Sequence, residues 1–254
     1  MSELCIHSRE GRPIHSVDEW RCLASPQGGD KQWKDGRSAK ELAKAWFAPK
    51  VPRELGRLFE SHKLTRGLVV ESAIAELTTE LDDFPGEPRH HDLVLLCRSG
   101  KVRALVGVEA KADEEFGPVI QEELKRVKKS GRHSNLPQRV HQLSQAIFGR
   151  SVDDAIGRLR YQLLHGLAGT LIEARSRSCD VAVFVVHEFI SDNKTQQQKI
   201  DRNVRDFERF VQALPALTSS VVREGSLLGP IRIPGGKFVP GDIPVMIGKV
   251  TIRL

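Results

Sequence analysis

The segment RHHDLVLLCRSGKVRALVGVEAK, residues 89–111, decides the fold of this chain. Its pattern predicts an apolar strand that begins at Asp92, a tight Ser-Gly turn, and a longer strand that ends at Lys111. In the second strand the two-residue period places Glu109 and Lys111 on the same face. The segment therefore predicts a β-hairpin with one carboxylate at its entry and a charged pair at its exit.

The composition is that of a folded protein. The chain has 254 residues, of which 39% are hydrophobic and 28% are charged, and this excludes a disordered or fibrous protein. Lys and Arg outnumber Asp and Glu by 39 to 33, which gives a formal net charge of +6 and a mild bias towards polyanionic partners.

The four cysteines lie far apart and form no CxxC pair, so the sequence does not resemble a secreted disulfide scaffold. The N-terminus lacks the apolar core of a signal peptide, and the longest apolar run, 181–186, is far below the ~20 residues of a membrane helix. We therefore expect a soluble cytoplasmic protein without a membrane partner.

Upstream of the hairpin, the pattern predicts short helices and one strand. A capping box begins a helix at Ser38, and Leu55 marks a second amphipathic helix. Residues 66–75 suit another short helix with Glu71 on its border, and 77–81 alternate as a strand.

Downstream, the pattern alternates between helices and strands. Charged residues 117–139 predict a helix and a basic loop, and Ser151 with Asp154 is expected to begin the longest helix. The β-branched run 181–186 indicates a central strand covered on both faces. Another helix and a Pro/Gly-rich tail with two strand candidates follow.

This order predicts an α/β protein with a mixed sheet, built from packed layers. We expect an N-terminal helical segment at 1–65 packed on the core, the core itself at 66–215, and a C-terminal β extension at 216–254.

The hairpin residues and their neighbours resemble the PD-(D/E)xK phosphodiesterase superfamily, whose fold is that of restriction endonucleases. The resemblance covers roughly residues 66–190 and implies an αβββαβ core. It rests on Asp92 near the start of the second strand and on Glu109-Ala-Lys111 near the end of the third. His91 stands where that superfamily has a proline. The motif Glu-Ala-Lys-Ala-Asp-Glu, residues 109–114, is also similar to uncharacterised bacterial domains.

The chemistry of phosphodiester hydrolysis explains the residue types. A hard cation, Mg²⁺ or Mn²⁺, neutralises the developing charge and is held by carboxylates, which Asp92 and Glu109 can supply. Lys111, on the same face as Glu109, places a positive charge beside the reacting phosphate.

The resemblance implies three further site residues. The carbonyl of Ala110 is a further metal ligand, Glu71 corresponds to a helix carboxylate that many members add, and Gln162 corresponds to a polar residue that orients the catalytic lysine or the phosphate.

Other interpretations stay open at the same residues. Glu109 and Lys111 also suit a simple cross-face ion pair. Glu71, with Glu76 and Glu80 close by, also suits a solvated position. His90 and His91 are better explained as strand-entry histidines than as metal ligands.

The function that these patterns favour is a divalent-metal-dependent nuclease that acts on DNA rather than RNA. Cutting both strands of a duplex would favour a homodimer. The basic stretch after the hairpin suits contact with a phosphate backbone; its residues are Lys125, Lys128, Lys129, Arg132 and Arg139. Two alternatives are an inactive nuclease-fold module that binds nucleic acid or a protein, and an interaction domain in which Glu109 and Lys111 merely pair.

Overall fold

A computed structural model describes residues 4–26, 28–47, 51–131, 133–192 and 195–254. Its centre is a mixed eight-stranded sheet with the strand order β2-β1-β3-β4-β5-β6-β8-β7. The strands are β1 (Cys5–Ser8), β2 (Pro13–Ile14), β3 (Val69–Thr79), β4 (Arg89–Ser99), β5 (Val102–Lys111), β6 (Val181–Ile190), β7 (Leu227–Ile231) and β8 (Val245–Arg253). The expected α/β class with a mixed sheet is confirmed.

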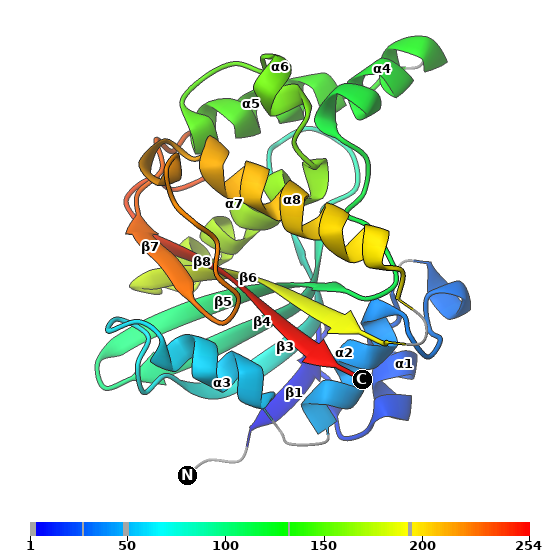
Figure 1. Cartoon of the computed structure of the whole chain (residues 1–254), viewed down its shortest axis with the longest axis vertical. Coiled ribbons are helices and arrows are strands. Elements are labelled where there is room, and N and C mark those ends of the chain that lie inside the picture. Colours follow the sequence, from blue (N-terminus) through cyan, green and yellow to red (C-terminus); the bar gives the residue numbers. More distant parts are fainter. Residues whose placement is uncertain (1–3, 27, 48–50, 132, 193–194) are drawn as a thin grey trace.

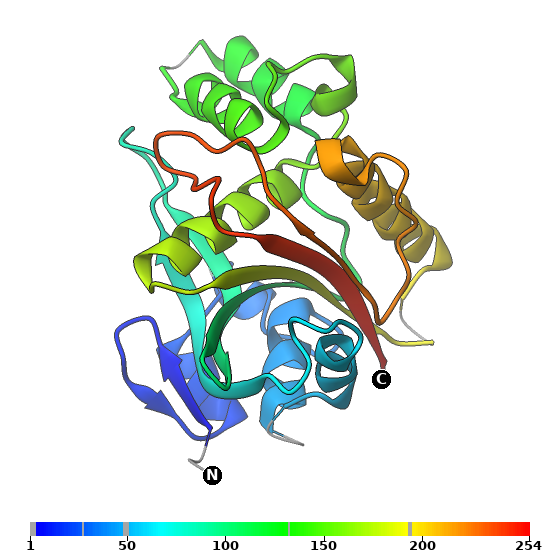
Figure 2. The same cartoon turned by 90° about the vertical axis from the view of Figure 1, so that its left-hand side faces the viewer.

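Helices cover both faces of the sheet (Figures 1 and 2). One face carries α1 (Val17–Leu23), α2 (Ser38–Phe47) and α3 (Arg53–Glu60), and the other carries α7 (Tyr161–Ser176) and α8 (Gln197–Ala213). A cap of three helices stands above α7 in Figure 1: α4 (Ile120–Ser130), α5 (Leu136–Phe148) and α6 (Asp154–Gly157). Two short 3-10 turns are η1 (Gly29–Lys31) and η2 (Pro215–Leu217).

The hairpin at 89–111 forms as predicted. β4 and β5 pair antiparallel from Ser99↔Val102 to Leu93↔Val108. β6 then runs parallel to β5, and every residue of β6 is buried because helices cover it on both sides. An apolar core lies on each face of the sheet, so the hairpin is fixed from two directions.

The short helix expected over 66–75 is absent from the described structure, where β3 occupies most of that stretch. β3 pairs with β4 on one side and with β1 on the other. Its inner face carries the small residues Ala73 and Ala75, which are fully buried against the N-terminal helices. Tertiary pairing therefore overrides the helical propensity of the alanines and glutamates here.

The single long helix expected after Ser151 is divided into α6 and α7. Asp153 is the N-cap of α6, and its side chain accepts a hydrogen bond from the Ile156 amide. The chain then extends at Arg160, which forms a β-bridge with Val119 before α7 begins. The longest described helix is α8, with 17 residues.

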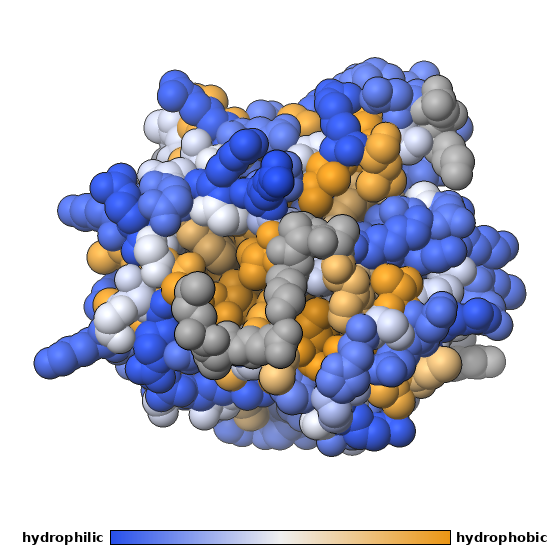
Figure 3. Space-filling model, turned by 90° about the horizontal axis from the view of Figure 1, so that it is seen from below, coloured by the Kyte–Doolittle hydropathy of each residue, from blue (hydrophilic) through white to orange (hydrophobic). Residues whose placement is uncertain are grey.

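Both ends of the chain contribute to the central sheet. The N-terminal segment supplies β1 and β2 in addition to helices, and β8 lies between β6 and β7 rather than outside the core. None of the helices in the described ranges is long and apolar enough to cross a membrane. Seen from below, apolar side chains gather at the centre of the molecular face (Figure 3).

Candidate active site

The site begins where the β4–β5 ladder ends. The last backbone pair is Leu93↔Val108. One residue further, the Asp92 side chain replaces the missing strand partner: its Oδ2 accepts a hydrogen bond from the Ala110 amide at 2.6 Å. This bond fixes the Asp92 carboxylate against the end of β5, next to the predicted Glu109-Ala-Lys111 triplet.

Glu109 and Lys111 point to the same side of β5, as the strand period predicts. The Lys111 Nζ donates to Glu109 Oε1 at 2.7 Å and to the Ala110 carbonyl at 3.1 Å. The Arg89 guanidinium donates to the other oxygen of Glu109. Both oxygens of this fully buried carboxylate are therefore held by cationic side chains.

The two cations determine the charge of Glu109. Burial alone raises the pKa of a carboxyl group, but Lys111 and Arg89 outweigh burial and hold the pKa of Glu109 below its ordinary value. Burial likewise opposes the charge of Lys111, yet Glu109 and Asp92 raise the pKa of Lys111 above its ordinary value. Glu109 is therefore negatively charged and Lys111 positively charged at neutral pH.

Glu76 is a buried carboxylate that joins this group from β3. Its backbone has φ = 53°, in the left-handed region that non-glycine residues rarely adopt. Such a conformation costs about 1 kcal/mol or more and persists where the surroundings enforce it. Burial, then the negative charge of Asp92, raises the pKa of Glu76 to about 9.

Asp92 experiences the same crowding of negative charge. Burial, then the charge of Glu109, raises the pKa of Asp92 to about 7, against the opposing effect of Lys111 and Arg89. The three carboxyl groups therefore lie close enough to disfavour one another's ionisation, and two cations do not fully compensate them.

These residues open into one pocket of about 530 Å³. Asp92, Glu76 and Lys111 line it, while the α2 end and the cap helix α5 supply walls from the two helical layers. Glu109 lies behind Lys111 and is fully buried. The pocket is thus a space between the N-terminal layer and the cap, with the charged group at its base.

Gln162 and the histidines near the site differ in their hydrogen bonds. Gln162 lines the pocket, and its Oε1 accepts a hydrogen bond from the Gly117 amide at 3.1 Å. His91 is buried beside Thr79, with its Nε2 3.1 Å from the hydroxyl oxygen. His90 and His165 line the pocket, and the Nδ1 of each is buried without a hydrogen-bond partner among the described residues.

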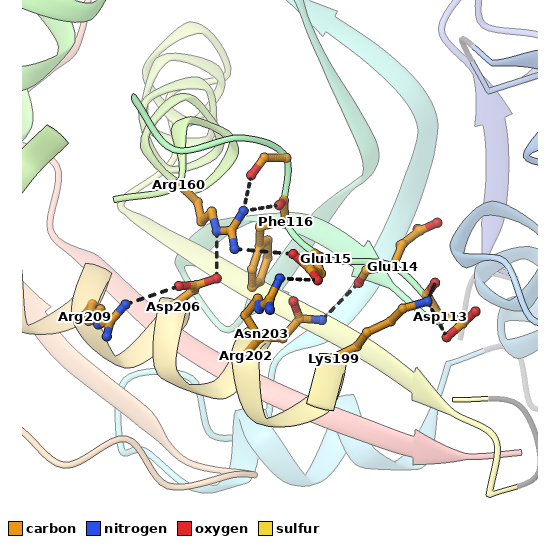
Figure 4. Close-up of polar contacts among 11 residues, drawn as sticks. Asp113, Glu114, Glu115, Phe116, Arg160, Lys199, Arg202, Asn203, Asp206 and Arg209 are labelled. Carbon is orange, nitrogen blue, oxygen red and sulfur yellow. Dashed lines mark hydrogen bonds and ion pairs between the residues drawn. The ribbon is translucent and has the colours of Figure 1, made fainter. Parts of the chain in front are cut away.

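Helix α8 fixes the segment that follows Lys111 (Figure 4). Lys199 donates to the Asp113 carboxylate at 3.0 Å, and Arg202 donates to Glu115 at 2.6 Å. Arg160, at the start of α7, donates to the carbonyl oxygens of Phe116 and Gly117. Because Glu115 and Gly117 line the pocket, these contacts position its wall.

Glu71 is not brought to the site. It lies near the opposite end of β3, is exposed, and accepts a hydrogen bond from Arg98 at 2.7 Å. Arg98 is six residues from Asp92 along β4, a separation of about 20 Å. Glu76, rather than Glu71, is the carboxylate of β3 that lines the pocket with Asp92.

The predicted basic stretch is divided between two environments. Lys125, Lys128 and Lys129 are exposed on α4, which projects from the cap in Figure 1. Arg139 instead lines the pocket and forms an ion pair with the largely buried Asp82 at 2.5 Å. Arg132 lies outside the described residues.

Sequence reasoning missed the roles of Glu76 and Arg89. Glu76 has no spacing signal because its side chain is placed by an unusual backbone angle. Arg89 precedes the predicted strand by three residues, and only the folded hairpin brings it to Glu109.

Within the ranges that the structure describes, no three His, Cys, Asp or Glu side chains are already arranged as metal ligands. The donor chemistry nevertheless fits a hard divalent cation. All the candidate donors are oxygens, and Glu76 and Asp92 are acidic groups whose pKa values are raised by burial and then by a neighbouring carboxylate. A bound cation favours the ionised form of both groups.

A family model described as "Domain of unknown function (DUF6946)" matches residues 13–254. The chain belongs to this family. The match spans both helical layers, the cap and the whole sheet except β1, so the DUF6946 domain includes every residue of the pocket described above. No curated protein and no solved structure gives a match to the chain.

Proposed function

We propose that this DUF6946 protein is a divalent-metal-dependent nuclease that hydrolyses phosphodiester bonds, with DNA favoured over RNA as the substrate. The observation that carries the proposal is the convergence of Glu76, Asp92 and the Glu109–Lys111 pair at one pocket. Two strands of a hairpin and a third strand with an unusual backbone angle place these groups together.

Asp92 and Glu76 are the residues we assign to hold Mg²⁺ or Mn²⁺, together with the carbonyl oxygen of Ala110. Glu109, whose two oxygens are held by Arg89 and Lys111, adds negative charge behind them. When bound, the metal neutralises charge on the phosphate and lowers the pKa of an attacking water. The resemblance of the hairpin to the PD-(D/E)xK superfamily supports this assignment.

The other residues position and stabilise the reacting groups. Lys111 lines the pocket, and we assign its ammonium group to stabilise negative charge on a phosphate in the transition state. Arg89 fixes the second oxygen of Glu109 and so orients the carboxylate that holds Lys111. Gln162 holds the Gly117 amide, which keeps the pocket wall in place.

The positive charge of the protein supports a nucleic-acid substrate, and its free cysteines support a reducing compartment. The net charge is +6, and Lys125, Lys128 and Lys129 are exposed on α4, the helix that projects from the cap (Figure 1). All four cysteines are free, in agreement with a cytoplasmic location. Cleavage of both strands of a duplex favours a homodimer, because two copies of the chain supply two pockets of this kind.

The test is cleavage of labelled DNA and RNA by purified protein in Mg²⁺ or Mn²⁺. Wild type should cleave at least one substrate, whereas Asp92→Ala and Lys111→Ala should lose about 10²-fold or more of the rate. Both variants must show cooperative unfolding. Equal residual cleavage by wild type and Lys111→Ala would point to a contaminating nuclease and contradict the proposal.

The second candidate is a catalytically silent module with the same fold that binds nucleic acid or a protein. The saturation of Glu109 by Arg89 and Lys111 favours it, because that carboxylate has no free oxygen. The two candidates differ in metal binding: a silent module binds no stoichiometric Mn²⁺, and its nucleic-acid affinity is the same with Mn²⁺ and with EDTA.

A further inference from the structure

A second concavity, of about 380 Å³, lies between α8, the beginning of α4 and the segment just before α7. We call it the arginine groove. Its lining has five arginines against two carboxylates; the full lining is Val119, Gln121, Glu122, Arg158, Arg160, Arg202, Arg205, Asp206 and Arg209. Guanidinium groups are always charged and match phosphate oxygens in geometry.

Three of these arginines form a row on α8. Arg202, Arg205 and Arg209 follow one another at intervals of three and four residues, so they share one face of the helix. The row spans about 10 Å, close to the axial length of three base steps of a nucleic-acid strand. Side chains on the opposite face of α8, such as Phe207 and Phe210, are buried in the core. The row is therefore held rigidly and faces solvent.

The row contains cations that the fold does not use. Arg205 is exposed, and no acidic side chain among the described residues lies within ion-pair distance of it. Arg209 is 61% exposed, and its contact with Asp206 is long, at 3.8 Å. In contrast, Arg160 is held by Asp206 at 2.7 Å and by two carbonyl oxygens (Figure 4). Arg160 thus builds the groove, while Arg205 and Arg209 are available to a ligand.

The groove already holds one anion. The Glu115 carboxylate lies 2.6 Å from Arg202 and 3.5 Å from Arg160. Glu115 also lines the pocket that contains Asp92, and Arg160 donates to the carbonyl oxygens of Phe116 and Gly117. Two arginines of the groove are therefore bonded to the segment that forms part of the pocket wall, and this segment connects the groove to the pocket.

We infer that the arginine groove binds the phosphodiester backbone of the nucleic-acid substrate and leads it to the pocket; this inference rests on the proposed function. An acidic protein is a poorer occupant, because protein interfaces bury an apolar centre and this groove offers only Val119 as an apolar side chain. A phosphate backbone requires no such centre, since charge neutralisation supplies most of its binding energy.

The test compares two charge-matched double variants. Arg205→Gln/Arg209→Gln removes the two available cations of the groove. Arg53→Gln/Arg57→Gln removes two exposed arginines from α3, on the opposite face of the sheet. Binding of a fluorescein-labelled DNA duplex, and of single-stranded DNA and RNA, is measured by anisotropy in EDTA from about 50 to about 200 mM salt.

The inference expects the groove variant to lose affinity by about tenfold at moderate salt and the slope of log K against log salt to fall by about two. The α3 variant should bind within about twofold of wild type. Arg205→Glu also changes the charge of the groove by two units and should weaken binding to a similar extent, and unfolding curves must show that each variant is folded.

Three results would overturn the inference. The groove variant binds like the α3 variant, wild type binds none of the nucleic acids, or polyglutamate displaces the duplex as well as an equal charge of unlabelled DNA. The last result would indicate an acidic protein partner. Because binding is measured in EDTA, groove-dependent binding without cleavage in Mg²⁺ contradicts the nuclease proposal alone and leaves the groove assignment standing.

Discussion

Arg89, the first residue of β4, donates to the carboxylate of Glu109, the eighth residue of β5. Both side chains are buried, with 6% and 0% of their surface exposed. The pair joins the two strands of the hairpin next to the pocket, which Arg89 lines, and it orients the carboxylate that also holds Lys111.

Arg89→Met should lower the free energy of unfolding by about 3 kcal/mol, because it leaves Glu109 buried with one of its two cationic partners. The matched control lies on the same strand. Arg98→Met breaks an exposed pair with Glu71 and should cost about 0.5 kcal/mol. Urea unfolding measures both, and equal effects of the two variants would contradict the structural role of Arg89.

Glu76→Gln should stabilise the protein while weakening metal binding. The folded pKa of Glu76, about 9, lies above its ordinary value of 4.5, so the unfolded chain releases this proton first as pH rises. Wild type therefore loses stability between about pH 4.5 and pH 9, and Gln, which does not titrate, avoids that loss. We expect a gain of about 1 kcal/mol or more at neutral pH.

Glu80→Gln is the control for this prediction, since Glu80, the residue that follows β3, is exposed. It should change stability by less than about 0.5 kcal/mol. Thermal unfolding at neutral and alkaline pH compares the variants. A Glu76→Gln protein that is less stable than wild type at every pH would show that Glu76 has a structural role only.

His187 should make the protein less stable in acid. Burial lowers the pKa of His187 to about 3, and neither ring nitrogen has a hydrogen-bond partner among the described residues. The unfolded chain binds a proton below about pH 6.5 and the folded chain does not, so stability is lost as pH falls from about 6.5 towards 3.

The contribution of His187 near pH 5 should be about 2 kcal/mol. His187→Leu removes the titrating group, so its unfolding free energy should fall less than that of wild type between neutral pH and pH 5. Urea unfolding at several pH values gives the two slopes, and parallel curves would contradict the assignment.

Gly107 allows β5 to approach α7 closely. A Cβ at this position would collide with the hydroxyl oxygen of Thr170. Gly107→Ala should therefore cost about 2 kcal/mol. Gly56→Ala, in α3, meets no atom within 4 Å and should instead stabilise by about 0.5–1 kcal/mol through helix propensity. Thermal unfolding distinguishes the two signs, and a neutral Gly107→Ala would contradict the close packing.

The elements that the sequence predicts correctly have strong local patterns. β5 alternates, and β6 is a continuous apolar run, so periodicity is sufficient for both. β3 shows alternation only at its end, within 77–81. Its earlier buried positions include Ala73 and Ala75, and its pairing with β1 joins segments that are distant in sequence. The break between α6 and α7 depends on a bridge from Arg160 to Val119, which no local pattern reveals.

The site shows the same division. Asp92, Glu109 and Lys111 follow from strand period and register, which are local properties of one hairpin. Glu76 depends on a left-handed backbone angle in another strand. Arg89 lies beyond the last paired residues of the hairpin, and only its long side chain reaches Glu109. The interpretation of Glu109 and Lys111 as an ion pair and their interpretation as part of a metal site are both compatible with this geometry. A measurement of metal binding distinguishes the two interpretations.

Calorimetric titration of Mn²⁺ is that measurement. Wild type and Glu71→Gln should bind Mn²⁺ stoichiometrically, because Glu71 lies far from the pocket. Asp92→Asn should lose binding, and Glu76→Gln should weaken it by about tenfold or more. Absence of stoichiometric binding to wild type, or equal binding to wild type and Asp92→Asn, would contradict the assignment of this pocket as a metal-dependent catalytic site.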